Sequence, residues 1–397
     1  MPQYKESVRE AGQWLVRRLR RAGLENVQML RTEGLPAVFA QWTRAPADAP
    51  TLLIYGHYDV QPIYIHHIDQ WPNQPFDPKI EDGEFLGRGV DDNKGNLLMA
   101  LQAVEAYLKT EELPVNVKFL IEAEEETGSA NLAQLLRRKR KLLAADLAVS
   151  TDGGQISATQ GGIPISMRGR VSFDLEAVTA SHDAHSGFVG GSVPNAVHAL
   201  LSVLSSLHLP NGSIAVEGFY DGVRDISDED RQDISAFPFD EDSEAASLGL
   251  KSHYGEEGYS TLERRWLRPS LEIVGGRLVT EPYRMPKDSL GNRAAAKVLK
   301  EVMGNDVLWY MEGHSVACSN QFREYLGILT TQFGFGIPDY QAQSEMDGAC
   351  RNDERLSVAT FHRGRRAWAM LLHEIAVQSG LPSGHPVPCM PSAEEDK

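Results

Sequence analysis

Short apolar runs alternate with helical stretches from residue 37 to residue 152, and this alternation limits the fold more than any other feature. The strand-like runs are residues 37–42, 51–56, 115–124 and 146–152, and the helical stretches between them are 96–109 and 129–141. Runs of the first kind are typical of buried strands, and apolar residues at three- and four-residue steps are typical of helices. Such interleaving predicts an α/β layered domain with a largely parallel sheet, whose ligands usually bind at the carboxyl ends of its strands.

The pattern changes from about residue 163. Residues 170–178, "RVSFDLEAV", alternate apolar and other side chains and predict a strand, and residues 193–208 predict a helix. Strong helical patterns return at 291–304 and 356–377. We therefore expect a smaller α+β domain at 163–284, inserted into a larger domain made of residues 1–162 and 285–397.

Composition and charge exclude several classes of protein. The 397 residues are 42% hydrophobic and 24% charged, as in an ordinary soluble globular protein. A net charge of −16 disfavours binding to nucleic acid. The three cysteines are too few for a disulfide scaffold, and the sequence shows neither a signal-peptide pattern nor an apolar run of membrane-spanning length. We expect a cytoplasmic protein with no membrane partner.

Four polar clusters follow strand-like runs. They are "GHYD" at 56–59, "GRGVDDNKG" at 87–95, "EAEEETGS" at 122–129 and "VSTDGG" at 149–154. Each has an ordinary explanation when taken separately, such as a turn, a helix N-cap or a solvated face. Together they would crowd carboxylates at one edge of a sheet, where the charges repel unless cations neutralise them. The four clusters therefore predict a metal centre.

The same four motifs, in this order and spacing, resemble a known family. It is the zinc metallopeptidase family of cytosolic dipeptidases and carnosinases, glutamate carboxypeptidases, aminoacylases, acetylornithine deacetylases and succinyl-diaminopimelate desuccinylases. The motif "GHYDVQP" places the chain closest to the dipeptidase branch. The resemblance implies a zinc-exopeptidase-like catalytic domain, with a mixed, mostly parallel sheet and helices on both faces, plus an inserted α+β lid and dimerisation domain. It also implies hydrolysis of the amide bond of dipeptides or short peptides.

The resemblance implies a set of metal ligands. His57 would bind one metal, Asp92 would bridge two, and Glu126 and Asp152 would be terminal ligands. The family pattern of Asp, any residue, Lys and Gly selects Asp92 over its neighbour Asp91. Zinc accepts imidazole and carboxylate ligands. We expect two zinc ions per chain, with manganese or cobalt as alternatives.

Three further residues receive roles from the resemblance. Asp59 lies two positions after His57, on the same side of an extended chain, and would orient the imidazole. Glu125 would be the general acid and base for the attacking water. His185, in "SHDAHSGFVGG" at 181–191, would bind the substrate carbonyl in the active site of a partner subunit. The smaller domain would then form the interface of a homodimer.

The sequence departs from the family at two places. The last histidine ligand is missing, and anchoring on "NDER" at 352–355 leaves Cys350, Asp347, Glu345 or no residue in its place. The smaller domain is also shortened, so that only Arg277 and Arg284 are candidates for holding the carboxylate of the substrate. Two alternatives therefore stay open, an N-acyl amino-acid deacylase with the same metal centre and a degenerate member with little or no activity.

Overall fold

The computed structural model describes residues 4–63, 71, 73–110, 113–273, 281–313, 316–337, 354–381 and 386–390. The chain divides into two compact units. The first unit consists of Met1–Ser166, Tyr283–Tyr310 and Val316–Lys397, and the second of Met167–Pro282 and Met311–Ser315. The second unit therefore interrupts the first in the sequence.

A six-stranded sheet forms the centre of the first unit. Its strands, in spatial order, are β1 (Glu25–Leu30), β2 (Ala37–Trp42), β6 (Asn116–Glu122), β3 (Thr51–His57), β7 (Leu147–Ser150) and β11 (Thr330–Gln332). The pairs β1–β2 and β2–β6 are antiparallel, whereas β6–β3, β3–β7 and β7–β11 are parallel. The mixed, mostly parallel sheet expected from the sequence is confirmed.

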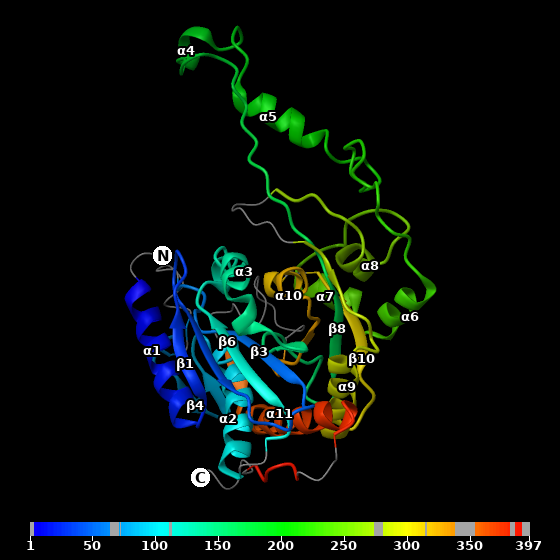
Figure 1. Ribbon diagram of the computed structural model, residues 1–397. Helices are drawn as coiled ribbons and strands as arrows, with labels where there is room; N and C mark the ends of the chain where they lie inside the picture. Colours follow the sequence, from blue (N-terminus) through cyan, green and yellow to red (C-terminus); the bar gives the residue numbers. More distant parts are fainter. Residues whose placement is uncertain are drawn as a thin grey trace. The chain divides into compact units, whose positions relative to one another are not determined.

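Helices cover both faces of this sheet. Leu52 and Ile54 of β3 belong to one buried apolar cluster, and the alternating residues Leu53 and Tyr55 belong to another, because successive side chains of a strand point to opposite faces. The helices of the first cluster are α1 (Lys5–Arg21), α2 (Lys94–Thr110), α9 (Leu290–Met303) and α11 (Val358–Gln378). Those of the second cluster are α3 (Leu132–Leu143) and α10 (Ala317–Leu326), which pack against each other (Figure 1). The predicted layered architecture is therefore correct.

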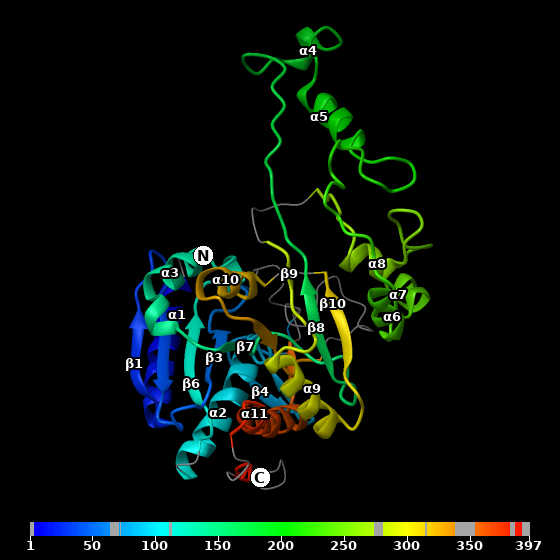
Figure 2. The same ribbon diagram turned by 45° about the vertical axis from the view of Figure 1, so that its right-hand side comes forward.

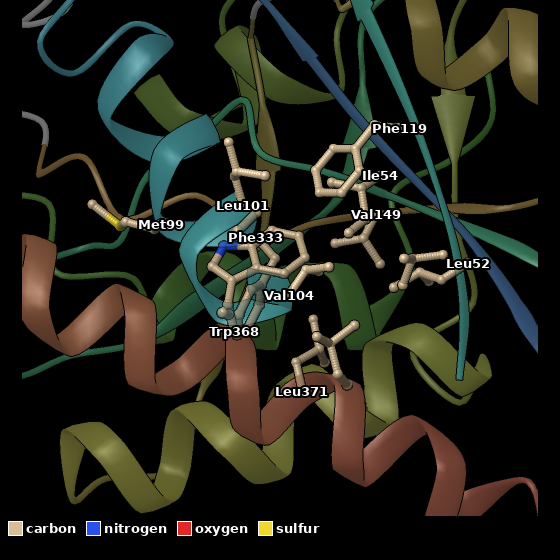
Figure 3. Packing of buried hydrophobic residues seen from close by; sticks show 14 of the residues in the cluster. Leu52, Ile54, Met99, Leu101, Val104, Phe119, Val149, Phe333, Trp368 and Leu371 are labelled. Carbon is tan, nitrogen blue, oxygen red and sulfur yellow. The ribbon is translucent and has the colours of Figure 1, made fainter. Parts of the chain in front are cut away.

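Trp368 lies at the centre of the larger cluster. Its indole is fully buried and meets the ring of Phe333 edge-on, with ring centroids 5.3 Å apart. Figure 3 shows Val104 of α2 and Leu371 of α11 beside this pair, together with Leu52 and Ile54 of the sheet. The long helix α11, from the last part of the chain, thus packs against the sheet formed largely by the first part.

Two smaller sheets complete the described strands. One has the order β10 (Leu308–Glu312), β8 (Gly162–Met167) and β9 (Tyr283–Arg284), which lie side by side in Figure 2. The other has the order β12 (Arg355–Ser357), β5 (Glu84–Leu86) and β4 (Lys79–Glu81). The antiparallel pairing of β12 with β5 places residues 355–357 beside residues 84–86, which precede α2 in the sequence.

The described residues of the second unit are mainly helical. The helices are α4 (Ser186–Val189), α5 (Ala196–Ser205), α6 (Asp228–Ala236), α7 (Glu241–Ser247) and α8 (Thr261–Trp266). Residues 171–178 form no strand, so the interpretation of their alternation as sheet is wrong, and Val171 and Phe173 are exposed. Alternation produces a strand only where a neighbouring strand satisfies the backbone. The proposed roles of this unit as lid and dimer interface stay predictions.

No helix in the described part of the chain is both long and apolar enough to cross a membrane. The 21-residue helix α11 is the longest described, and it carries Arg363, Arg365 and Arg366 within its length. Such charged side chains are costly in the interior of a bilayer.

Candidate metal centre

The parallel strands β3, β6 and β7 bring three of the four sequence clusters to one edge of the sheet. His57, the last residue of β3, pairs with Glu122, the last residue of β6. Tyr55 pairs with Ser150 of β7, so Asp152 follows two residues later, level with His57. Because parallel strands end at the same edge, the register alone places these side chains near one another.

Three of the predicted ligands meet at the imidazole of His57. Its Nε2 atom lies 2.9 Å from Oδ1 of Asp92 and 3.9 Å from Oδ2 of Asp152. One ligand atom from each of the three residues lies within 4.8 Å of the others. His57 is fully buried, and the two carboxylates are about one-fifth exposed. A divalent cation could be held by this group.

Asp59 connects the imidazole to the acidic turn that follows β6. The Nδ1 atom of His57 lies 3.1 Å from the backbone oxygen of Asp59 and 3.4 Å from its Oδ1 atom. The same carboxylate accepts the backbone N–H groups of Glu125 and Glu126, at 3.3 and 3.1 Å. A proton on Nδ1 directed at Asp59 leaves Nε2 available to a metal, which is the usual arrangement of a ligating histidine.

Glu125 and Glu126 begin a single turn of 3₁₀ helix, Glu125–Thr127. Burial raises the pKa of Glu125 well above its usual value, and the nearby charge of Asp152 raises it further. Burial also raises the pKa of Glu126 to about 8, with the charge of Asp92 as the next cause. Gln61 donates a 2.6 Å hydrogen bond to the Glu126 carboxylate. The charged form of each carboxylate is therefore disfavoured in this site.

The contact between His57 and Asp92 affects the pKa of both residues. Burial alone would lower the pKa of His57, but hydrogen bonds to Asp59 and Asp92 outweigh it and raise the pKa well above the usual value. Burial would raise the pKa of Asp92, but the hydrogen bond and charge of His57 outweigh it and lower the pKa. The donor set of one imidazole and several carboxylates fits a divalent cation, whose charge would offset that of the carboxylates.

Two contributors to the site were missed in the sequence. Gln61 lies within "GHYDVQP", where only the histidine and aspartate received roles. Glu354 lies within "NDER", which served only to locate the missing histidine, yet its carboxylate accepts the backbone N–H groups of Asp91 and Asp92 at 2.9 and 3.0 Å. The glutamate of the "NDER" motif is itself the signal that could have identified Glu354 from the sequence.

The other predicted site residues are placed as follows. His185 lies in the second unit, is exposed, and caps α4 by accepting the backbone N–H of Gly187 at Nδ1, at 3.0 Å. Arg284 lies in β9. The remaining candidates lie outside the described residues, namely Arg277, Glu345, Asp347 and Cys350.

The sequence is similar to those of known peptidases. Residues 53–374 match the peptidase family M20/M25/M40. The chain belongs to this family. It is 33% identical to a Beta-Ala-His dipeptidase of Homo sapiens over 243 residues, which cover 60% of this chain and 47% of that protein. It is 27% identical to a cysteinylglycine-S-conjugate dipeptidase of Corynebacterium striatum over 280 residues, which cover 69% and 59%. This peptidase-family chain spans about half the length of the curated relatives it matches.

Solved structures share the fold of this M20-family chain. A metallo-carboxypeptidase of Sulfolobus solfataricus aligns with a TM-score of 0.78 and 23% identity, covering 93% of this chain and 94% of the other. Human carnosine dipeptidase 1 aligns with a TM-score of 0.76 and 22% identity, covering 95% and 93%. The family inferred from the four motifs is confirmed.

Proposed function

We propose that this chain hydrolyses the amide bond of dipeptides or short peptides in a metal-dependent reaction. The observation that carries the proposal is the meeting of His57, Asp92 and Asp152 at the carboxyl edge of the sheet. Membership of the M20 peptidase family supports it, as do the curated relatives, which are named as dipeptidases. The chain lacks the motifs of serine hydrolases, HExxH metalloproteases and P-loop enzymes.

His57, Asp92, Glu126 and Asp152 would hold the metal, with Asp92 shared between two zinc ions. When bound, such cations supply a Lewis acid for the scissile carbonyl and lower the pKa of a water molecule. Asp59 holds the imidazole of His57 in the tautomer that binding requires, through the contacts at Nδ1. Manganese or cobalt could replace zinc, because the same donors bind these ions.

Glu125 is the proposed general acid and base. Its side chain is half-buried with the charges of Asp152, His57 and Asp92 nearby, and burial together with the charge of Asp152 raises its pKa above the usual value. It would take a proton from the attacking water and deliver it to the leaving amine. The hydrogen bond from its backbone N–H to Asp59 fixes the turn from which the side chain projects.

His185 is proposed to donate to the carbonyl oxygen of the substrate as negative charge develops there. The second unit would supply it to the site of a partner subunit in a homodimer. Support for this role comes from the motif at 181–191 and from the exposure of His185 in this chain. We also propose that the protein is located in the cytoplasm.

The test is an assay of the full chain on a panel of dipeptides and N-acetyl amino acids, before and after treatment with a chelator. We expect hydrolysis of dipeptides that the chelator abolishes and added zinc or manganese restores. Faster hydrolysis of N-acetyl amino acids would favour the deacylase instead. A folded protein that binds no metal and hydrolyses neither class would identify a degenerate family member.

A further inference from the structure

The loop that carries Asp92 is held by a carboxylate from a distant part of the chain. Glu354, only 1% exposed, points its two oxygens at the backbone of residues 88–92. Its Oε2 atom accepts the N–H of Gly89 at 2.8 Å and the guanidinium of Arg88 at 2.9 Å. Its Oε1 atom accepts the N–H groups of Asp91 and Asp92, at 2.9 and 3.0 Å. Four donors from one short loop thus share one buried carboxylate.

A strand pairing brings Glu354 to this place. Arg355 pairs with Leu86 in the antiparallel β12–β5 ladder, and the backbone oxygen of Glu354 extends the ladder by accepting the N–H of Gly87, at 3.2 Å. Side chains alternate along this segment, since Glu354 and Leu356 are buried and Arg355 between them is exposed. The register therefore directs the carboxylate inward, at the loop that follows β5.

The loop has little room to take another shape. Gly89 has a φ of +82°, and a Cβ atom there would lie 2.5 Å from Cγ1 of Val60. A Cβ atom on Gly95 would lie 2.0 Å from the backbone oxygen of Val90 and 2.6 Å from the Leu356 side chain. All three distances are shorter than any ordinary contact, so the loop is fitted closely to Val60 and the first turn of α2 is fitted closely to the loop and to Leu356 of β12.

We propose that Glu354, with Arg88 as its ion partner, is a positioning residue that fixes the backbone of Asp92 so that the Asp92 carboxylate stays at Nε2 of His57. The inference rests on the metal site proposed above. The hydrogen bond from Asp92 to Glu354 comes from the backbone N–H of Asp92 and leaves its carboxylate to face His57. Its loss would leave buried N–H donors without an acceptor, and the loop would move to satisfy them.

A merely structural role would lower stability without changing the affinity of the site for metal. The two roles are separated by Glu354→Gln, which keeps the size of the side chain but turns one acceptor oxygen into a donor facing other donors. The matched control is Glu374→Gln. Glu374 is also buried and accepts Lys297 Nζ at 2.7 Å and Gln378 Nε2 at 2.8 Å, but it lies on α11 away from the loop.

The experiment measures the zinc affinity of both variants and of the wild-type chain by competition with a chromophoric chelator, together with urea unfolding. We expect Glu354→Gln to weaken zinc binding by about 10- to 100-fold, the usual effect of losing a residue that supports a metal ligand. Glu374→Gln should lower the urea midpoint and leave zinc affinity unchanged. Arg88→Gln, which removes only one of the four donors, should show a smaller loss of affinity than Glu354→Gln.

A folded Glu354→Gln variant with wild-type zinc affinity would overturn the inference and leave the proposed function intact. If Glu354→Gln does not fold, wild-type affinity in a folded Arg88→Gln variant overturns it instead. A wild-type chain that binds no zinc, manganese or cobalt would overturn both the inference and the proposed function.

Discussion

The imidazole Nε2 of His57 lies 2.9 Å from a carboxylate oxygen of Asp92, although the two residues are 35 positions apart in the sequence. One ends a central strand, and the other lies just before the helix α2 that covers the sheet. The contact joins a buried base to a half-buried acid at the edge where Asp152 follows the end of β7.

Replacing the proposed base should separate chemistry from metal binding. We expect Glu125→Gln to lower kcat by about 100- to 10,000-fold, the usual contribution of general acid–base catalysis, because an amide cannot accept the proton of the water. Metal content, measured by elemental analysis of the purified protein, should stay at the wild-type value. The paired variant Glu126→Gln should instead lose metal. The reverse result would mean that the two glutamates exchange roles.

Asp59 should control the affinity of the site without binding metal itself. In Asp59→Asn, the amide cannot accept from His57 Nδ1 and from both backbone N–H groups of the acidic turn as the carboxylate does. We expect metal affinity to fall by about 10- to 100-fold. Asp146→Asn is a suitable control, since Asp146 accepts the N–H of Thr51 at the opposite end of the same strand. Equal affinity in both variants would contradict the orienting role of Asp59.

Glu122 should make the stability of the metal-free protein depend on pH. Burial raises its pKa from the ordinary value of 4.5 to about 7, although hydrogen bonds from Tyr55 and Ser129 act in the opposite direction. Between these two values the folded state holds a proton that the unfolded state releases. The free energy of unfolding therefore falls as the pH rises from 4.5 to 7, by roughly 3 kcal/mol for this group.

The measurement compares wild type with Glu122→Gln by urea unfolding at several pH values in the presence of a chelator. The glutamine oxygen can still accept from Tyr55 and Ser129, so folding should be retained. The variant should gain stability relative to wild type as the pH rises through this window. A difference that is constant across pH would show that Glu122 does not hold the proton.

Trp368 should be a sensitive position of the core. Trp368→Ala removes a fully buried indole that packs against Phe333, and substitutions of this kind cost about 3–5 kcal/mol. Trp368→Phe retains an aromatic ring and should cost less. Thermal unfolding of the two variants beside wild type measures the order. A larger loss for the phenylalanine variant would contradict the packing described for α11.

The sequence predicted the core fold well because hydrophobic period is a local property. The alternation of strand-like and helical segments identified β2, β3, β6 and β7 and the helices between them, and the residues that follow these strands were expected at one edge. The same reasoning failed at residues 171–178. Their alternation matches a strand, but no sheet pairing forms there, and pairing depends on what lies beside a segment.

The residue types of the site and their order could be inferred from the sequence alone, since His57, Asp92 and Asp152 follow recognisable segments. Tertiary structure decided which of them meet, because parallel register sets His57 level with Asp152 to within a residue. Tertiary structure alone determined the contact of Glu354 with Asp92. The two residues are 262 positions apart, and the β12–β5 pairing brings them together. Local pattern specifies segments, whereas contacts between distant segments arise only when the whole chain is packed.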